Sequence, residues 1–458
     1  MSKVFITEDI LQQTADAIRE ASNSNAQIKP VDFPEKIKEL PYWYGVRKDC
    51  EVINTTLTRI GSPVLHRTLP IHSNMRRCLV LDDGTVNYYL DANDSTLKED
   101  GTPAVLDGTD GQVMVEIQEH YVQLYVETDP VTGHEIEYRK ISMLPLQGFT
   151  RVPKCYISAF EAALDRTNSK LASVVNTTAQ YRGGNNTSGW DGTYRSLLGM
   201  PATSINETNF RTYANNRGTG WVDNDTITYD IMCNLYLIEY ANTNCQLTLN
   251  VNPDANGYKQ GGLGAGVSNM SDWSNYNSYN PIIPCGVTLS LGNATGVVTH
   301  NVIASDGSTK HYEASVPSYR GIENPFGHIW KFVDGILINI AAEGTSDVYR
   351  CTDPTKYSSS LTADYVKIGE EARTSGWTKN VIFPTLIASE VGGVDSSTGY
   401  CDYHYTSLPD SGNSVRALLV GGDAHNGSID GLSSANSCNT PSDSAALIGS
   451  RLCFHPAV

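Results

Sequence analysis

Apolar residues recur at helical spacing over residues 1–42 of the chain. The first apolar face consists of Ile10, Leu11, Ala15, Ile18 and Ala21. Thr7 is placed to cap this helix, and a second short helix is predicted from Asp32, with Phe33, Ile37 and Leu40 on one face. Two short amphipathic helices bury too little apolar area to be stable alone. We therefore expect residues 1–42 to dock onto a partner protein or onto copies of themselves, or to pack as a hairpin on the next part of this chain.

Residues 43–147 carry β-strand patterns. Two runs, at residues 78–81 and 85–90, flank the turn Asp82-Asp83-Gly84, and residues 121–126 and 135–141 flank a turn that contains Pro130 and Gly133. Apolar runs around such turns predict β-hairpins. The acidic residues stand singly at turns, so we expect a small all-β spacer domain without a catalytic site.

Residues 148–458 mix helical and strand patterns. The capping-box sequence Ser204-Ile205-Asn206-Glu207 predicts a helix start, and a second helix is predicted after Asp230. Trp221 is expected in the core that these two helices share. Short strands and long loops rich in Gly, Asn, Ser and Tyr follow, and residues 336–340 form a predicted strand. The fold class indicated for the whole chain is α+β.

The chain ends in a polar, glycine-punctuated run between two strand patterns, at residues 415–454. The strand patterns lie at residues 416–420 and 447–454, and Gly421, Gly422, Gly427, Gly431 and Gly449 read as the framework. This arrangement predicts a surface displayed on a rigid frame, and an ordinary long surface loop is the alternative.

Composition narrows the possible partners. The chain has 458 residues and a net charge of -17, which argues against binding to nucleic acid and to anionic membrane surfaces. No run is long and apolar enough for a transmembrane span, and the N-terminus lacks the apolar core of a signal peptide. The ten cysteines form no C-x-x-C motif, so we expect buried thiols in a chain that folds in a reducing cytoplasm.

Residues 148–458 resemble a known family at several segments, namely residues 209–221, 229–240 and 321–335, and most specifically Arg416-Ala417-Leu418-Leu419-Val420-Gly421-Gly422 with Ile448-Gly449-Ser450-Arg451-Leu452. The chain is similar to the variable proteins that diversity-generating retroelements diversify, the family of the phage major tropism determinants. The resemblance implies a C-type-lectin-like fold for residues 148–458, shared with formylglycine-generating enzymes, and a diversified binding surface in the loop between the two strands. Residues 1–42 resemble attachment segments of phage tail and fibre proteins, at residues 15–19 and 28–34.

The family's mode of diversification implies which positions vary. Diversity there comes from replacing adenines, mostly in Asn codons, which does not produce Lys, Glu, Gln, Met or Trp, and residues 415–454 contain none of these five. The candidate variable, ligand-binding positions are Asp423, His425, Asn426, Ile429, Asp430, Ser434, Asn436, Cys438, Asn439, Asp443 and Leu447. Ile429, Leu447 and Cys438 are unusual choices for a polar surface loop, although Leu447 also suits a core position.

Catalytic and metal-binding alternatives lack a supporting pattern. Formylglycine-generating enzymes bind copper through a closely spaced cysteine pair, whereas Cys438 and Cys453 are far apart in sequence. Asp423, Asp430 and Asp443 contain the carboxylates that a glycoside hydrolase needs, but no pattern selects two of them. His425 with Asp423 or Asp430 would suit calcium or zinc, and a simple polar contact is the plainer interpretation. We therefore expect no enzyme activity, no cofactor and no bound metal.

These observations lead to one main hypothesis and one rival. The chain is expected to be a receptor-binding protein of a bacteriophage tail fibre or tail tip, made in the host cytoplasm and carried on the virion. Its partners would be a bacterial surface receptor, either protein or glycan, and other virion tail proteins held through residues 1–42. A homotrimer would strengthen binding by avidity. The rival is a structural baseplate or decoration protein, and a host-encoded adhesin is a weaker alternative.

Overall fold

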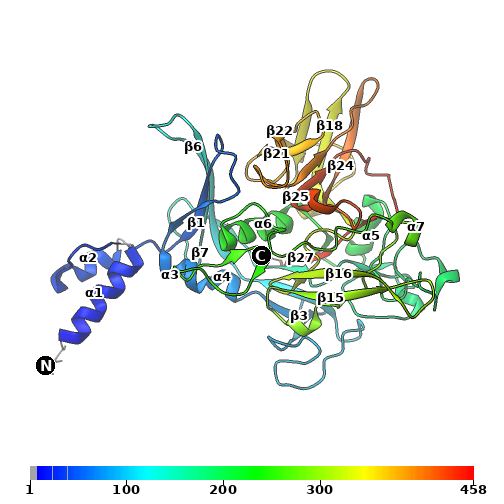
Figure 1. Cartoon of the computed structure of the whole chain (residues 1–458), viewed down its shortest axis with the longest axis horizontal. Helices are drawn as coiled ribbons and strands as arrows, with labels where there is room; N and C mark the ends of the chain where they lie inside the picture. Colours follow the sequence, from blue (N-terminus) through cyan, green and yellow to red (C-terminus); the bar gives the residue numbers. More distant parts are fainter. Residues whose placement is uncertain (1–7, 23, 39, 458) are drawn as a thin grey trace.

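The computed structural model describes residues 8–22, 24–38 and 40–457 of the chain (Figure 1). It is a mixed α+β structure in which sheets dominate and few helices are long. Thr7, the expected cap of the first helix, lies outside the described residues.

The first two helices form an arm that projects from the body (Figure 1). Helix α1 spans Glu8–Ser22, and α2 spans Phe33–Lys38 after a 3-10 turn at Pro30–Asp32. Ala15, Ile18 and Phe33 make a small apolar cluster of their own, separate from the core of the body. An ion pair between Glu20 and Arg67 of α3 (Pro63–Thr68) adds a link to the body. The predicted helical hairpin is therefore present, with its second helix starting one residue later than expected.

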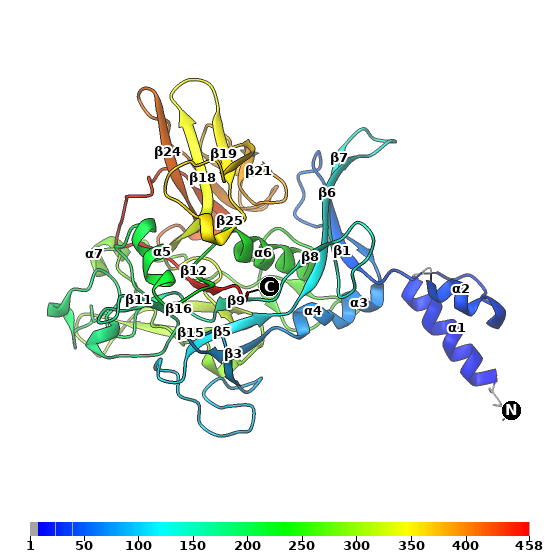
Figure 2. The same cartoon turned by 180° about the vertical axis from the view of Figure 1, so that it is seen from behind.

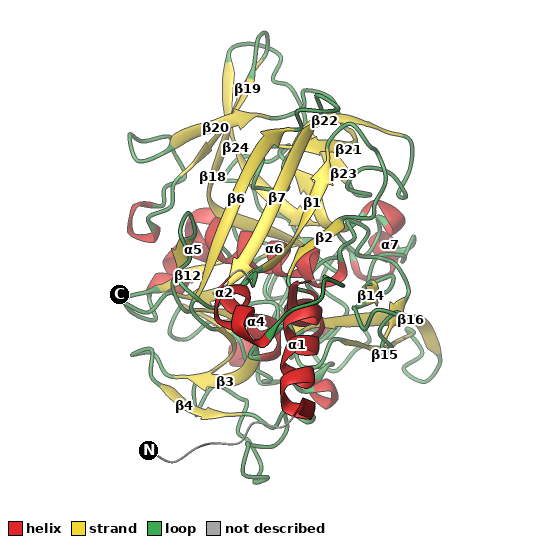
Figure 3. Cartoon of the chain, turned by 90° about the vertical axis from the view of Figure 1, so that its left-hand side faces the viewer, coloured by secondary structure: helices red, strands yellow, loops and turns green. Residues whose placement is uncertain are grey.

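The sheet next to the arm has five strands (Figure 3). Its order is β2 (Thr58–Gly61), β1 (Tyr44–Asp49), β7 (Glu135–Ser142), β6 (His120–Thr128) and β8 (Thr150–Val152). Strands β6 and β7 are antiparallel and form the second predicted hairpin, with Tyr121 opposite Ser142.

A six-stranded sheet joins parts of the chain that the sequence pattern had separated. Its order is β12 (Trp221–Asp223), β27 (Leu452–Phe454), β9 (Cys155–Ser158), β5 (Gln112–Ile117), β3 (Arg76–Val80) and β4 (Val86–Tyr89). Strands β3 and β4 form the first predicted hairpin. Strand β5 pairs with β9 and β9 pairs with β27, so one sheet crosses the expected boundary between residues 147 and 148. Residues 43–147 are thus not an independent all-β domain, because β5, β3 and β4 share one sheet with β9, β27 and β12 of residues 148–458.

The largest sheet has nine strands and stands above the six-stranded sheet (Figure 2). Its order is β20 (Val366–Glu370), β19 (Ser346–Arg350), β18 (Trp330–Ala341), β24 (Asn413–Gly421), β25 (Gly431–Asn436), β23 (Tyr403–Tyr405), β21 (Gly376–Val381) and β22 (Ala388–Gly393), with β26 (Ile448–Gly449) paired to β18. The predicted strands at residues 336–340 and 416–420 are confirmed as parts of β18 and β24, which pair with each other.

Helix α6 (Thr226–Tyr240) packs against strands of all three sheets, namely β1, β7, β9 and β18. It begins five residues earlier than predicted, because Asp225 accepts a hydrogen bond from the Thr228 N–H and caps it, while Asp230 lies inside the helix. The residues of the helix are buried on nearly every side, as expected for a helix in the centre of a core. Helix α5 (Glu207–Asn215) is capped by Asn206 instead of Ser204.

The remaining elements among the described residues are two short helices, two hairpins, a three-stranded sheet and several 3-10 turns. They are α4 (Pro70–Ser73), α7 (Trp273–Asn277), the hairpins β10 (Ala163–Asp165) with β11 (Lys170–Ala172) and β13 (Leu249–Asn250) with β14 (Gln260–Gly261), the sheet of β15 (Gly296–Ile303), β16 (Lys310–Tyr319) and β17 (Ile322–Glu323), and 3-10 turns at Ala179–Tyr181, Ser188–Trp190, Leu289–Leu291, Pro354–Lys356 and Gly427–Ile429. As expected, most cysteines are buried thiols, and Cys438 alone among the ten is half-buried. No helix among the described residues is long and apolar enough to cross a membrane.

Candidate functional site

The segment expected to form one displayed loop is divided by a strand. Residues 431–436 form β25, which pairs antiparallel with β24 and parallel with β23 inside the nine-stranded sheet. Outside this strand lie two connections, residues 422–430 before β25 and residues 437–447 after it. The expectation of a single continuous loop is therefore wrong, and the strand itself belongs to the frame.

Three of the candidate ligand-binding residues are buried. Asp423 is 6% exposed, and Asp430 and Ser434 are 0% exposed. Asp423 accepts a hydrogen bond from the Trp330 indole Nε1–H, with its Oδ2 at 2.9 Å, and a second one from the His425 backbone N–H. Ser434 lies in β25, where strands on both sides flank it. These three side chains support the fold and are not offered to a ligand, which corrects the prediction for them.

The side chain of Asp430, the last residue of the first connection, is completely buried. A Cβ atom placed on Gly422, whose φ is +81°, would lie 1.7 Å from Asp430 Oδ1, so only glycine fits there. Burial and the nearby Asp423 raise the pKa of Asp430 well above its ordinary range, which favours the neutral acid. Gly431 has the same relation to Asp402, because its Cβ would lie 2.2 Å from that carboxyl. The glycines predicted as framework at 422 and 431 thus make room for buried acids.

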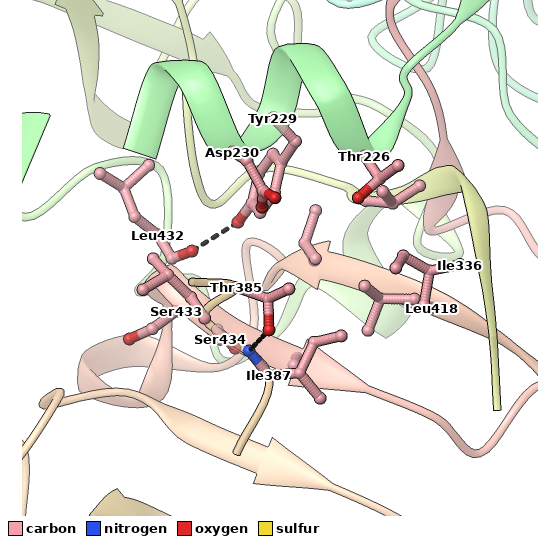
Figure 4. A pocket seen from close by; sticks show the side chains of 14 residues that line it. Thr226, Tyr229, Asp230, Ile336, Thr385, Ile387, Leu418, Leu432, Ser433 and Ser434 are labelled. Carbon is pink, nitrogen blue, oxygen red and sulfur yellow. Dashed lines mark hydrogen bonds between the residues drawn. The ribbon is translucent and has the colours of Figure 1, made fainter. Parts of the chain in front are cut away.

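The inner face of β25 packs on helix α6 and leaves almost no free space. Figure 4 shows Leu432, Ser433 and Ser434 below Tyr229 and Asp230 of the helix. The cavity between them measures about 10 Å³, and Tyr229 donates a hydrogen bond from its hydroxyl to the Leu432 carbonyl oxygen. A cavity of this size holds at most one water molecule, so this face is core and any ligand must bind the other side of the sheet.

The other candidate residues reach the surface in two groups. His425 is exposed, and Asn426 and Ile429 are half-buried on the first connection. The second group consists of Asn436, Cys438, Asn439, Asp443 and Leu447, all half-buried. Leu447 packs at the edge of two apolar clusters, which fits the core alternative for this residue.

Backbone hydrogen bonds hold both connections in place. The Met270 N–H donates to the Ala424 oxygen at 2.6 Å, and the Ala424 N–H donates to the His328 oxygen at 3.0 Å. On the second connection the Ala417 N–H donates to the Asn439 oxygen at 2.9 Å, and Arg416 Nη1 donates to the Cys438 oxygen at 2.7 Å. The two connections contribute only main-chain atoms to these contacts, so the contacts do not depend on which side chains the connections carry.

Three aromatic residues missed in the sequence stand beside the second group. Trp377, Tyr403 and Tyr405, which we call the aromatic strip, lie on β21 and β23 and are half-buried. Their ring centroids are 5.6 Å apart between Trp377 and Tyr403 and 4.8 Å apart between Tyr403 and Tyr405. Strand pairing creates this neighbourhood, and the abundance of tyrosine in the chain is the only sequence signal that pointed towards it.

The two groups are linked from below by Trp330 and Asp423. The Trp330 ring meets the edge of Tyr405 at 6.1 Å and is bonded to Asp423, whose neighbour His425 lies 6.1 Å from the Tyr279 ring. The candidate site therefore comprises two groups of accessible residues over the buried pair Trp330 and Asp423, with the aromatic strip beside one group and Tyr279 beside the other.

The aspartate and cysteine side chains of this surface have partners or surroundings that differ from one another. Asp443 accepts a hydrogen bond from the Thr440 N–H and so serves a turn. Cys438 lies near Arg416, whereas Cys453 is fully buried with Thr228 Oγ1 3.2 Å from its sulfur, so the two thiols have different surroundings. Among the described residues, no group of three or more His, Cys, Asp or Glu side chains is arranged to hold a metal ion.

The comparisons with known proteins gave distant structural likenesses. No family model and no curated protein matches the chain. The structure of PvdO from Pseudomonas aeruginosa matches 77% of this chain and 98% of its own at 11% identity, with a TM-score of 0.32. The M1 variant of the Major Tropism Determinant matches 78% of this chain and 74% of its own at 12% identity, with a TM-score of 0.28, and the P3c variant matches 66% and 50% at 12% identity, with a TM-score of 0.24. These TM-scores are low, so the site is interpreted from the residues of this chain.

Proposed function

We propose that this chain is the receptor-binding protein of a bacteriophage virion and that it binds a bacterial surface receptor through the candidate surface. The observation that supports this proposal most is that the groups that hold the two connections in place differ from the side chains that reach the surface. Main-chain hydrogen bonds and buried acids fix the two connections, while the side chains of His425, Asn426 and Asn439 are accessible and take no part in those main-chain hydrogen bonds. Such a surface can change its side chains and keep its fold.

Binding on this surface is expected to be weak for one chain. Small polar side chains each contribute little free energy, so several identical copies acting together give useful affinity. We propose a homotrimer for this reason. The arm, which stands away from the body and exposes Val31 and Ile37, would attach the chain to other virion tail proteins.

The proposal is tested first in the DNA around the coding region. We expect a second copy of the segment for residues 415–454 that differs only at adenines, next to a reverse transcriptase gene. A single copy whose loop is identical in sister isolates would instead favour the structural baseplate or decoration role.

A binding experiment tests the receptor role directly. Fluorescent chain is added to a panel of bacterial strains, and adsorption is compared with that of an Asn426→Ala, Asn439→Ala double variant. We expect one or a few strains to bind the unchanged chain and the double variant to bind them more weakly. Asn93→Ala, at an exposed position on the loop after β4, serves as the control and should bind normally. No adsorption to any strain, or equal adsorption of all variants, would contradict the proposal.

A further inference from the structure

The aromatic strip shares one face of the sheet with candidate ligand-binding residues. In the strand register Trp377 lies opposite Tyr403 and Tyr405 lies opposite Asn436, and paired residues point to the same side of a sheet. Asn436 in turn lies opposite Leu419, whose side chain belongs to the buried cluster on this face. The face is thus core near β24 and continues as half-buried aromatic surface over β25, β23 and β21.

The rings of the strip are not packed face to face. Trp377 meets Tyr403 edge to face at 81°, and the Tyr403 and Tyr405 rings are tilted by 51°. Edge-to-face contact uses the edge of one ring, so part of the flat ring surface remains open to a ligand.

Unpaired polar groups surround these rings. Among the described residues, nothing hydrogen-bonds to the Trp377 Nε1–H, the Tyr403 and Tyr405 hydroxyls, the Asn436 amide nitrogen or the Asn439 side-chain amide, and none of these atoms is buried. Both donors and acceptors are therefore available within one aromatic surface.

The net charge of the chain disfavours an anionic ligand at the strip. Burial raises the pKa of the Tyr405 hydroxyl, and the acids Asp430 and Asp423 raise it further. Arg416 is the cation beside Cys438, and its Nη1 is already bonded to the Cys438 oxygen. With a net charge of -17 on the whole chain, an acidic polysaccharide or nucleic acid would meet repulsion.

We propose that the aromatic strip binds a neutral glycan of the bacterial surface, an inference that rests on the proposed receptor-binding function and names its ligand class. The apolar face of a sugar ring lies against Trp377 and Tyr403, where C–H groups meet the negative face of the π-system. The hydroxyl groups of the sugar exchange hydrogen bonds with Asn436, Asn439 and the tyrosine hydroxyls. Aromatic faces bordered by unpaired amides and hydroxyls satisfy both halves of a sugar, its C–H face and its hydroxyl edge.

The test uses the full-length chain on an array of neutral and acidic oligosaccharides, and on bound bacterial cells treated with either periodate or proteinase K. We expect binding to one or more neutral oligosaccharides, loss of cell adsorption after periodate, which cleaves vicinal diols, and retention after proteinase K. Trp377→Ala and Tyr405→Ala should each weaken glycan binding about tenfold. Tyr403→Phe keeps the ring and removes the hydroxyl, so a smaller loss is expected, and this variant controls for folding.

Tyr125→Ala is the matched surface control, because Tyr125 is a half-buried tyrosine stacked at 4.7 Å on Tyr138 in a different sheet. It should bind normally. Adsorption that proteinase K abolishes and periodate leaves intact would overturn the glycan proposal and keep the receptor function with a protein ligand. Glycan binding that Trp377→Ala and Tyr405→Ala leave unchanged would place the ligand elsewhere and overturn it too. Adsorption to no cells at all would refute the proposed function itself.

Discussion

The substitution Gly422→Ala tests whether the display surface depends on a closed position beneath it. Gly422 follows β24, where the chain leaves the sheet, and its φ of +81° is strained for any residue with a side chain. The new Cβ would lie 1.7 Å from Asp430 Oδ1 and 2.1 Å from its Cγ, so Asp430 must move, although it is completely buried.

The expected loss has two parts. The positive φ costs about 1–2 kcal/mol for a non-glycine residue, and forcing atoms into a filled core costs about 1–3 kcal/mol. The free energy of unfolding should therefore fall by about 2–5 kcal/mol. Gly412→Ala is the matched control: its φ is +66° at the start of the same strand, but no atom lies within 4 Å of its Cβ. It carries the first part alone, about 1–2 kcal/mol.

Urea unfolding followed by tryptophan fluorescence measures both variants. The same Gly422→Ala change is also made in an Asp430→Gly background, where the obstructing side chain is absent. There its cost should drop to that of Gly412→Ala. Equal losses for Gly422→Ala and Gly412→Ala, or an unchanged loss in the Asp430→Gly background, would refute the steric explanation.

Three further outcomes are expected. Burial raises the pKa of Asp402 from 3.8 to about 8. Between these pH values the folded chain holds a proton on this carboxyl that the unfolded chain releases. The free energy of unfolding therefore falls as the pH rises from about 4 to about 8, by up to about 1.4 kcal/mol per pH unit for this group. Asp402→Asn should flatten that slope in urea unfolding across this range, and an unchanged slope would exclude Asp402 as its source. Trp330→Phe removes the indole donor to buried Asp423 and should cost about 1–3 kcal/mol, whereas a loss within the error of the measurement would show that the bond contributes nothing. Deleting residues 1–42 should change the thermal unfolding of the body little. The arm has its own apolar cluster, and the exposed ion pair that links it to the body is worth at most about 1 kcal/mol. A body that unfolds cooperatively with the arm would contradict this.

The sequence predicted those elements whose causes are local. The hairpin of β3 and β4 follows from the Asp-Gly turn at residues 83–84 and the apolar runs beside it. The predicted helix starts were less accurate, because several polar residues near each start can serve as the N-cap. Ser204 has the sequence of a capping box, yet its φ is +58° and Asn206 caps the helix.

Strand β25 was missed because its cause is distant in sequence. Ser433 and Ser434 are small and polar, as in a loop, but the residues on either side of them pair with β24 and β23. Ser433 donates from its N–H and hydroxyl to Asp402. The aromatic strip was missed for a similar reason, since Trp377 and Tyr403 become neighbours only when β21 and β23 pair. The sequence pattern predicted a domain boundary between residues 147 and 148, but β5 and β9 pair across it in one sheet.

Burial along residues 415–454 limits which positions can vary without loss of the fold. Asp430 and Ser434 are completely enclosed, and a larger side chain at either position has no room. His425, Asn426 and Asn439 are accessible, and main-chain hydrogen bonds hold the connections that carry them. Replacing these side chains leaves those main-chain hydrogen bonds in place. If adenine replacement diversifies this segment, selection for folded protein must remove changes at the enclosed positions and keep those at the accessible ones. The aromatic strip lies outside residues 415–454, so it would stay constant while the side chains beside it change. A constant ring surface bordered by variable polar groups would keep one ligand class and alter which members of that class are bound.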